Sequence, residues 1–293
     1  MTISPYLIIF ELLMYGLLGL SVLDARKRGW HVVWQVIMGV TFGVLLEWAT
    51  IQQLHAYRYG RFLIMIAGET PLAIGAGWGV IIYASWLYAD ATDLPPWAKP
   101  ILAALLALNI DLSMDAIAIR LGMWDWGQGL DFQYFGVPWA NFWAWFWVVF
   151  FFTAGLSLMA RRPNALSRWL GPVGAMLLGV AGVLFTNKLI VDFTPRARYE
   201  EVIALVLLSA MGLMLALRPR LGRRLLPRIA AWTPAAFHGY FLAAGVISGV
   251  IFHPPILLAI SLLMAALAWL LHREKSNSGN PRAHNSQNTL QGV

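Results

Sequence analysis

Residues 139–160 read WANFWAWFWVVFFFTAGLSLMA and contain no charged side chain. A helix of this length is about 33 Å long, which is enough to cross a hydrocarbon core about 30 Å thick. In lipid only helices and closed barrels satisfy their backbone hydrogen bonds, and barrel strands are much shorter than this run. The stretch therefore predicts a transmembrane helix, and it decides the fold class because similar runs recur along the chain.

Comparable apolar runs extend in both directions from this segment. Hydrophobic residues make up 59% of the 293 positions and charged residues only 12%, about half the share in a soluble domain. We predict an all-α, polytopic transmembrane helical bundle that forms a single domain over residues 1–272, with eight spans as the alternative count. The nine predicted spans are about 3–23, 32–50, 71–89, 99–119, 139–160, 169–188, 200–217, 235–252 and 255–272.

The basic residues predict how the chain is oriented in the membrane. They occur in short clusters between apolar runs, which fits membrane topology better than nucleic-acid binding. With nine spans, 15 lysines and arginines fall on one side and 6 on the other. This asymmetry predicts a multi-pass protein of the cell membrane with its N-terminus outside and its C-terminus in the cytoplasm. The polar tail, residues 273–293, is predicted to be a disordered cytoplasmic segment.

Four carboxyl groups lie inside predicted spans, where each is costly and suggests a function. At 1.5 Å per residue, Glu47, Asp111 and Asp115 lie roughly 18–24 Å from the cytoplasmic side, and Glu11 lies about 10–12 Å below the outer surface. All four therefore fall in the outer half of the bilayer. We expect the second, fourth and fifth spans to pack together, so that Glu47, Asp111 and Asn141 line one cavity.

Asp111 and Asp115 are spaced i, i+4, which places both carboxyl groups on one helix face. Two such groups do not ionise together readily in a low dielectric, so one should hold a proton near neutral pH. A protonated acid in a dry cavity can protonate a carbon–carbon double bond, and aromatic faces can stabilise the resulting cation. The aromatic residues available near that depth are Trp78, Trp124, Trp126, Tyr134 and Trp145.

Structural explanations compete with this reading. Asp115 could be solvated near the helix exit, Glu47 could pair with Arg58 or Arg61, and Glu11 could pair or face an aqueous vestibule. The tryptophans of the fifth span could serve packing and the membrane interface.

Metal chemistry has little support in the sequence. His55, His238 and His253 lack partners at metal-ligand spacing, so no metal site is predicted. The absence of cysteine excludes thiolate ligands and cysteine nucleophiles.

Three separated motifs occur together in the middle of the chain. They are Asp111-Leu-Ser-Met-Asp115, Gly122-Met-Trp124-Asp-Trp126 and Tyr134-Phe-Gly-Val-Pro-Trp-Ala-Asn141-Phe-Trp-Ala-Trp145. In this order they resemble the carotenoid biosynthesis membrane-protein family, which includes carotenoid hydratases of the bisanhydrobacterioruberin hydratase and monocyclic carotenoid 1,2-hydratase type. The resemblance covers about residues 45–145, and an upstream block with Glu47, Tyr57, Tyr59 and Trp78 is similar to the family as well. The chain departs from the family at Ala116, where a proline is usual, and at residues 54–56.

The resemblance implies a cofactor-independent enzyme that protonates a terminal isoprenoid double bond and captures the cation with water. Its partners would be the lipid bilayer and a lipophilic carotenoid or isoprenoid substrate. It assigns acid–base chemistry to Glu47, Asp111 and Asp115. The expected substrate-binding residues are Tyr57, Tyr59, Trp78, Trp124, Trp126, Tyr134, Asn141 and Trp145.

Three other functions stay open at this point. A lycopene-cyclase-like enzyme would capture the same cation with an internal double bond. A magnesium-dependent membrane prenyltransferase would use an aspartate-rich motif like Asn109-x-Asp111-x3-Asp115, although its second such motif is missing from the sequence. A non-catalytic transporter often shows internal repeats and broken helices, and neither is apparent here.

Overall fold

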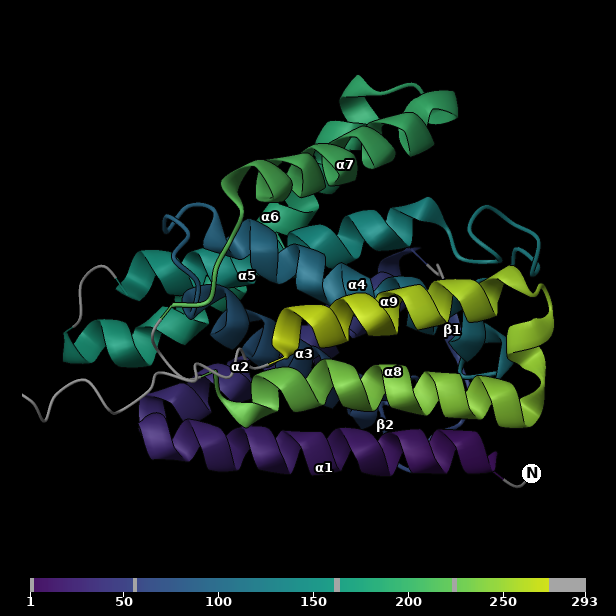
Figure 1. The fold of residues 1–293 in the computed structure, drawn as a ribbon, viewed down its shortest axis with the longest axis horizontal. Helices are drawn as coiled ribbons and strands as arrows, with labels where there is room; N and C mark the ends of the chain where they lie inside the picture. The colour runs from purple at the N-terminus through teal and green to yellow at the C-terminus, as the bar shows by residue number, and fades with distance from the viewer. Residues whose placement is uncertain (1–2, 55–56, 161–163, 223–225, 274–293) are drawn as a thin grey trace, which may run out of the picture.

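A computed structural model describes residues 3–54, 57–160, 164–222 and 226–273, which form a bundle of nine α-helices (Figure 1). The helices are α1 (Pro5–Arg28), α2 (Trp30–Leu54), α3 (Leu72–Asp90), α4 (Lys99–Arg120), α5 (Trp139–Ala160), α6 (Ala165–Phe193), α7 (Tyr199–Leu217), α8 (Arg228–Ser248) and α9 (Ile256–His272). The short elements are β1 (Arg58–Tyr59), β2 (Met65–Ile66), β3 (Thr70–Pro71), β4 (Trp124–Asp125) and the 3₁₀ turns η1 (Arg196–Arg198) and η2 (Val250–Phe252). The predicted all-α class is confirmed.

Each predicted span corresponds to one helix, with differences at the ends. Among the described residues, seven helices, α1 to α7, are long and apolar enough to cross a membrane. The eighth span was predicted at 235–252, but α8 ends at Ser248 because Gly249 adopts a left-handed conformation with φ of 81°. The sixth was predicted to begin at 169, but Asn164 caps α6 through a reciprocal bond with Ser167 and starts it earlier. The predicted tail lies outside the described residues, apart from Arg273.

Helices α3 and α4 form the centre of the bundle. In their apolar stretches 83% of the residues are buried inside the protein, against 11% in α7. Figure 1 shows α7 along one edge of the bundle, with α3 and α4 enclosed by other helices. Side chains on α3 and α4 are therefore shielded from lipid by protein, whereas α7 presents its apolar surface outward.

Glycines allow α2 and α3 to pack very closely. A Cβ added to Gly39 would lie 3.2 Å from the Cα of Gly79, and one added to Gly43 would lie 2.5 Å from the Cβ of Trp78. Small residues at such contacts are typical of membrane helix pairs, because they let the two backbones approach. The close approach places Trp78 beside the C-terminal half of α2, where Glu47 lies.

We expect Gly43→Ala to destabilise the protein by about 1–3 kcal/mol, because the new methyl group overlaps Trp78 in a packed interior. The matched control is Gly16→Ala in α1, where an added Cβ meets nothing within 4 Å. Thermal unfolding in detergent should show a lower midpoint for Gly43→Ala alone. Equal midpoints for the two variants would contradict the close packing of α2 on α3.

One end of the bundle, here called the loop end, carries the connections 57–71 and 121–138. Strand β1 pairs antiparallel with β4, so that Tyr59 lies opposite Trp124. Strands β2 and β3 form a small hairpin with Met65 opposite Pro71. The pairing of β1 with β4 ties the loop after α2 to the loop after α4, and it brings together aromatic residues that are far apart in the sequence.

Candidate active site

The two aspartates of α4 share one amide donor from α5. The Nδ2 atom of Asn141 donates to Oδ2 of Asp115 at 2.6 Å and to both carboxyl oxygens of Asp111 at 3.1 and 3.3 Å. Asp111 is 0% exposed and Asp115 is 2% exposed. Asp115 is therefore not solvated at a helix exit, and that structural alternative is wrong.

Glu47 on α2 accepts hydrogen bonds from three aromatic side chains. The indole Nε1 of Trp78 donates to Oε1 at 2.7 Å, and the hydroxyl of Tyr59 donates to Oε2 at 2.7 Å. The hydroxyl of Tyr57 donates to the same Oε2. Among the described residues neither Arg58 nor Arg61 forms an ion pair with this carboxyl group, so the predicted alternative of an arginine partner is wrong.

Both tyrosines remain donors across the physiological pH range. Burial, followed by the nearby Glu47 carboxyl group, raises the pKa of Tyr57 well above its usual value. The same two causes raise the pKa of Tyr59 well above its usual value. The phenols therefore stay neutral and keep their protons directed at Glu47.

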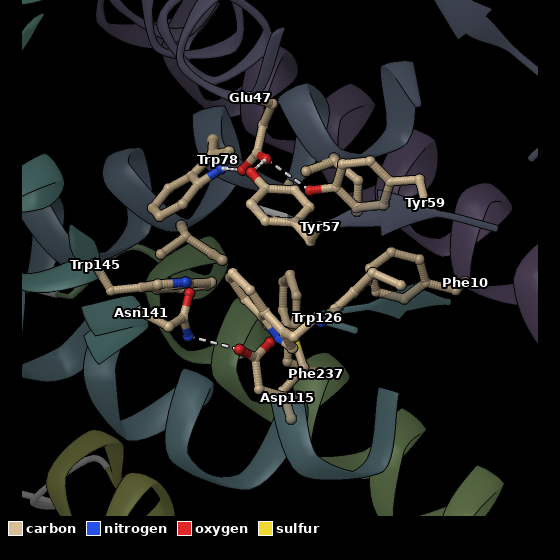
Figure 2. A pocket seen from close by; sticks show the side chains of 15 residues that line it. Phe10, Glu47, Tyr57, Tyr59, Trp78, Asp115, Trp126, Asn141, Trp145 and Phe237 are labelled. Atoms are coloured by element: carbon tan, nitrogen blue, oxygen red, sulfur yellow. Dashed lines mark hydrogen bonds between the residues drawn. The ribbon is translucent and has the colours of Figure 1, made fainter. Parts of the chain in front are cut away.

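A cavity of about 60 Å³ separates Glu47 from Asp115 (Figure 2). That volume is large enough to hold water. We call it the central cavity. Its walls are formed by Phe10, Glu47, Tyr57, Tyr59, Ile74, Gly77, Trp78, Ile81, Met114, Asp115, Trp124, Trp126, Asn141, Trp145 and Phe237.

Two of the predicted site residues do not line this cavity. Asp111 is not among its lining residues and contacts the site through the amide of Asn141. The hydroxyl of Tyr134 donates to the backbone carbonyl of Leu112 at 2.7 Å, and its ring packs against Phe142. The prediction that Asp111 faces the cavity is therefore wrong. Asp115, one turn later on the same face of α4, takes that place.

The predicted packing of the second, fourth and fifth spans needs a correction as well. Helix α3 packs against both α2 and α4, and among the described residues it is the helix through which these two are mainly connected. Glycines on α2 and α3 draw these two helices together, while α5 packs against α4 and also contacts α3. Glu47 and Asp115 consequently face each other across the central cavity and share no hydrogen-bond partner.

Aromatic rings surround the space between the two acidic groups. The rings of Trp78 and Trp145 lie 4.3 Å apart, centroid to centroid. Tyr57 contacts Trp126 edge-on at 4.6 Å. Electron-rich ring faces attract a cation placed within about 6 Å. The walls therefore offer aromatic rings that can stabilise a positive charge on carbon between the two carboxyl groups.

The sequence did not single out the wall residues Phe10 and Phe237. Phe10 comes from α1 and Phe237 from α8, and single phenylalanines in apolar spans carry no recognisable signal. The next residue, His238, could have provided one, since a polar group in a span is unusual. Its ring nitrogens contact the Ser113 hydroxyl at 2.9 Å and the Asn109 side-chain oxygen at 3.0 Å. These bonds hold α8 against α4.

Glu11 has a structural role at the loop end. Its carboxyl oxygens accept hydrogen bonds from the backbone amides of Leu63 at 2.6 Å and Ile64 at 3.0 Å, and from the Tyr15 hydroxyl at 2.7 Å. The residue is completely buried and does not line the central cavity. The predicted alternative of an aqueous vestibule at Glu11 is wrong, because the carboxyl group joins α1 to the connection before β2.

Potential metal ligands do not gather at this site. Within the described ranges, no group of three or more His, Cys, Asp or Glu side chains is placed to hold a metal ion. The neighbours of the aspartates are an amide and apolar or aromatic side chains. The site thus contains acidic groups on two sides of the central cavity, namely Glu47 on one side and the aspartate pair on the other.

Fold and site together define a helical membrane protein in which Glu47 and Asp115 face an aromatic cavity inside the bundle. The chain belongs to the carotenoid biosynthesis protein family, which matches it over residues 3–217. No curated protein and no solved structure matches the chain. The family match includes α1 to α7 and every wall of the central cavity except Phe237. The protein therefore has a role in carotenoid biosynthesis, and the suggested resemblance to this family is confirmed.

Proposed function

We propose that this protein is a carotenoid hydratase that adds water to a terminal isoprenoid double bond after protonating it. The observation that carries the proposal is the buried aspartate pair of α4, of which Asp115 lines an aromatic cavity. Family membership places the protein in carotenoid biosynthesis, and carotenoid substrates dissolve in the bilayer that surrounds the helices. No cofactor is needed, because the reaction transfers only a proton and a water molecule.

The acid in this proposal is Asp115. Its carboxyl group and that of Asp111 approach the same Asn141 amide, and both are buried. Two carboxylates at such close range in a low dielectric do not both carry a charge, so the pair retains one proton. Asp115 faces the cavity and Asp111 does not, which makes Asp115 the donor to the alkene and Asp111 the group that keeps the proton on the pair.

The cation formed by this step is tertiary, because protonation of a terminal dimethyl-substituted double bond leaves the charge on the carbon with the two methyl groups. Trp145 and Trp78 both line the cavity, with their ring centroids 4.3 Å apart. Cation–π contacts in desolvated sites contribute about 2 kcal/mol or more. The aromatic walls therefore support a reaction through a carbocation.

Substrate binding needs more space than the central cavity provides. Ligand sites usually enclose about 300 Å³ or more, whereas this cavity measures about 60 Å³. Trp126, which lies at the centre of Figure 2, comes from the connection after β4 and not from a helix. In this proposal Trp126 moves aside when the end of the carotenoid enters.

Expression of the protein in a lycopene-accumulating bacterium tests the proposal. We expect pigments heavier than lycopene by one water molecule for each modified end group, as measured by mass spectrometry. An empty-vector strain and an Asp115→Asn strain are the controls. Unchanged mass with a shifted absorption spectrum would mean that an internal double bond captures the cation, and the protein would then be a cyclase.

A further inference from the structure

Glu47 differs from the aspartate pair in how its charge is accommodated. An indole N–H can only donate, so Oε1 of Glu47 must act as the acceptor for Trp78. The hydroxyls of Tyr57 and Tyr59 both converge on the other oxygen. Burial of this carboxyl group favours uptake of a proton, and the three donors offset part of the cost of its ionised form. Glu47 is therefore suited to accept a proton, whereas the aspartate pair is suited to give one.

Comparison with Glu11 separates this arrangement from a purely structural one. Glu11 also accepts three hydrogen bonds, but two come from the backbone and the residue lines no part of the central cavity. Glu47 is held by side chains alone, and it lies on the cavity wall opposite Asp115 (Figure 2). A role in holding the fold together does not explain why the Glu47 side chain lines the central cavity.

A second pocket lies on the other side of the two tyrosines. It has a volume of about 340 Å³ and is lined by Ile51, Tyr57, Arg58, Tyr59, Gly68 and Glu69. We call it the loop-end pocket. Arg58, Gly68 and Glu69 are exposed, so this pocket opens at the surface of the loop end. Tyr57 and Tyr59 line both the loop-end pocket and the central cavity and thus stand between the two.

We infer that Glu47 is the base that activates water for addition to the cation, and that this water arrives from the loop-end pocket past Tyr57 and Tyr59. The inference rests on the proposed hydratase function and specifies its second half. It divides the chemistry between two walls of one cavity, with the acid on α4 and the base on α2. Tyr57, Tyr59 and Trp78 are positioning residues that fix the orientation of Glu47.

The proposed steps balance without another reactant. The Asp115 proton forms a C–H bond at one alkene carbon, and the electron pair of the double bond is used in that bond. The oxygen of a cavity water then bonds to the cationic carbon, while one of its O–H bonds breaks and that proton passes to Glu47. The net change in the substrate is the addition of one water molecule. A further cavity water returns the proton from Glu47 to the aspartate pair.

The test uses full-length protein in lycopene-containing vesicles suspended in heavy water. Two quantities are measured, namely hydrated product and deuterium in the recovered, unhydrated carotenoid. Deuterium reports protonation of the double bond followed by loss of a proton, whereas hydrated product reports capture by water. For Glu47→Gln we expect hydration to fall about 10²-fold or more, with deuterium still entering the recovered substrate. Glu201→Gln, at an exposed surface ion pair with Arg198, is the matched control and should leave both quantities unchanged.

Tyr59→Phe provides a second variant that keeps the ring and the Glu47 carboxyl group. Removing one of three donors should lower hydration about tenfold while deuterium incorporation stays at the level of the unaltered protein. An equal fall of both quantities in Glu47→Gln and in Tyr59→Phe would overturn the inference, because it would place Glu47 in the protonation step or in folding. Unchanged hydration in Glu47→Gln would overturn it too. Failure of the proposed function is distinct, since the unaltered protein would then yield no hydrated product.

Discussion

Asp115→Asn should abolish carotenoid conversion, with a loss of about 10²–10⁴-fold in product formed. Asparagine keeps the shape of the side chain and can still bond to Asn141, but it has no acidic proton to give to an alkene. The protein should fold normally, because the substitution removes a buried acid and adds no volume. Product is measured as pigment in cells and as deuterium incorporation in vesicles, and both should disappear together.

Asp111→Asn should lower carotenoid conversion less than Asp115→Asn does, by about tenfold. Asp111 does not line the central cavity, and its contribution is the like charge that keeps a proton on the pair. Asp192→Asn is the matched control, because Asp192 lies in an exposed pair with Lys188 that contributes little. A larger loss in Asp111→Asn than in Asp115→Asn would reverse the assigned roles. Near-normal conversion in both would contradict acid initiation from α4.

The helices were predictable because they depend on local properties of the sequence. Apolar runs of suitable length fixed the number of helices, and the spacing of Asp111 and Asp115 fixed their common face. The first and last residues of each helix were harder to predict, since they depend on single capping residues such as Asn164 and Gly249. The orientation in the membrane stays a prediction that rests on the distribution of the basic residues.

The arrangement of the site was only partly predictable. Depth in the membrane correctly suggested that Glu47 and the aspartates belong to one region, but depth says nothing about which helix lies between two others. The glycines that draw α3 against α2 determine that order, and their effect appears only in three dimensions. The choice between Asp111 and Asp115 depends on the rotation of α4 about its axis, which the i, i+4 spacing leaves undetermined. Phe237 enters from α8, far beyond the motifs.

The second large effect is expected at Asn141, where Asn141→Leu should lower the free energy of unfolding by about 3 kcal/mol, because buried acceptors lose their donor. The isosteric side chain removes the amide that donates to both aspartates and leaves two buried acids without that donor. Conversion should fall as well, because the proton shared by the pair is no longer held in place. Asn164→Leu is a useful comparison, since this surface N-cap of α6 is worth only about 1 kcal/mol.

A double substitution separates this explanation from a simple packing defect. In Asn141→Leu with Asp111→Asn, the new amide on α4 lies one helical turn from Asp115 and can donate to its carboxyl group. One buried acid then remains in place of two, and it regains a donor. Part of the lost stability should therefore return, as measured by thermal unfolding in detergent. The double variant should lose less free energy of unfolding than the sum of the losses in the two single variants. A leucine that merely fits poorly against α4 would be unaffected by the change at Asp111. Strictly additive losses would therefore show that the amide does not act through the acid pair.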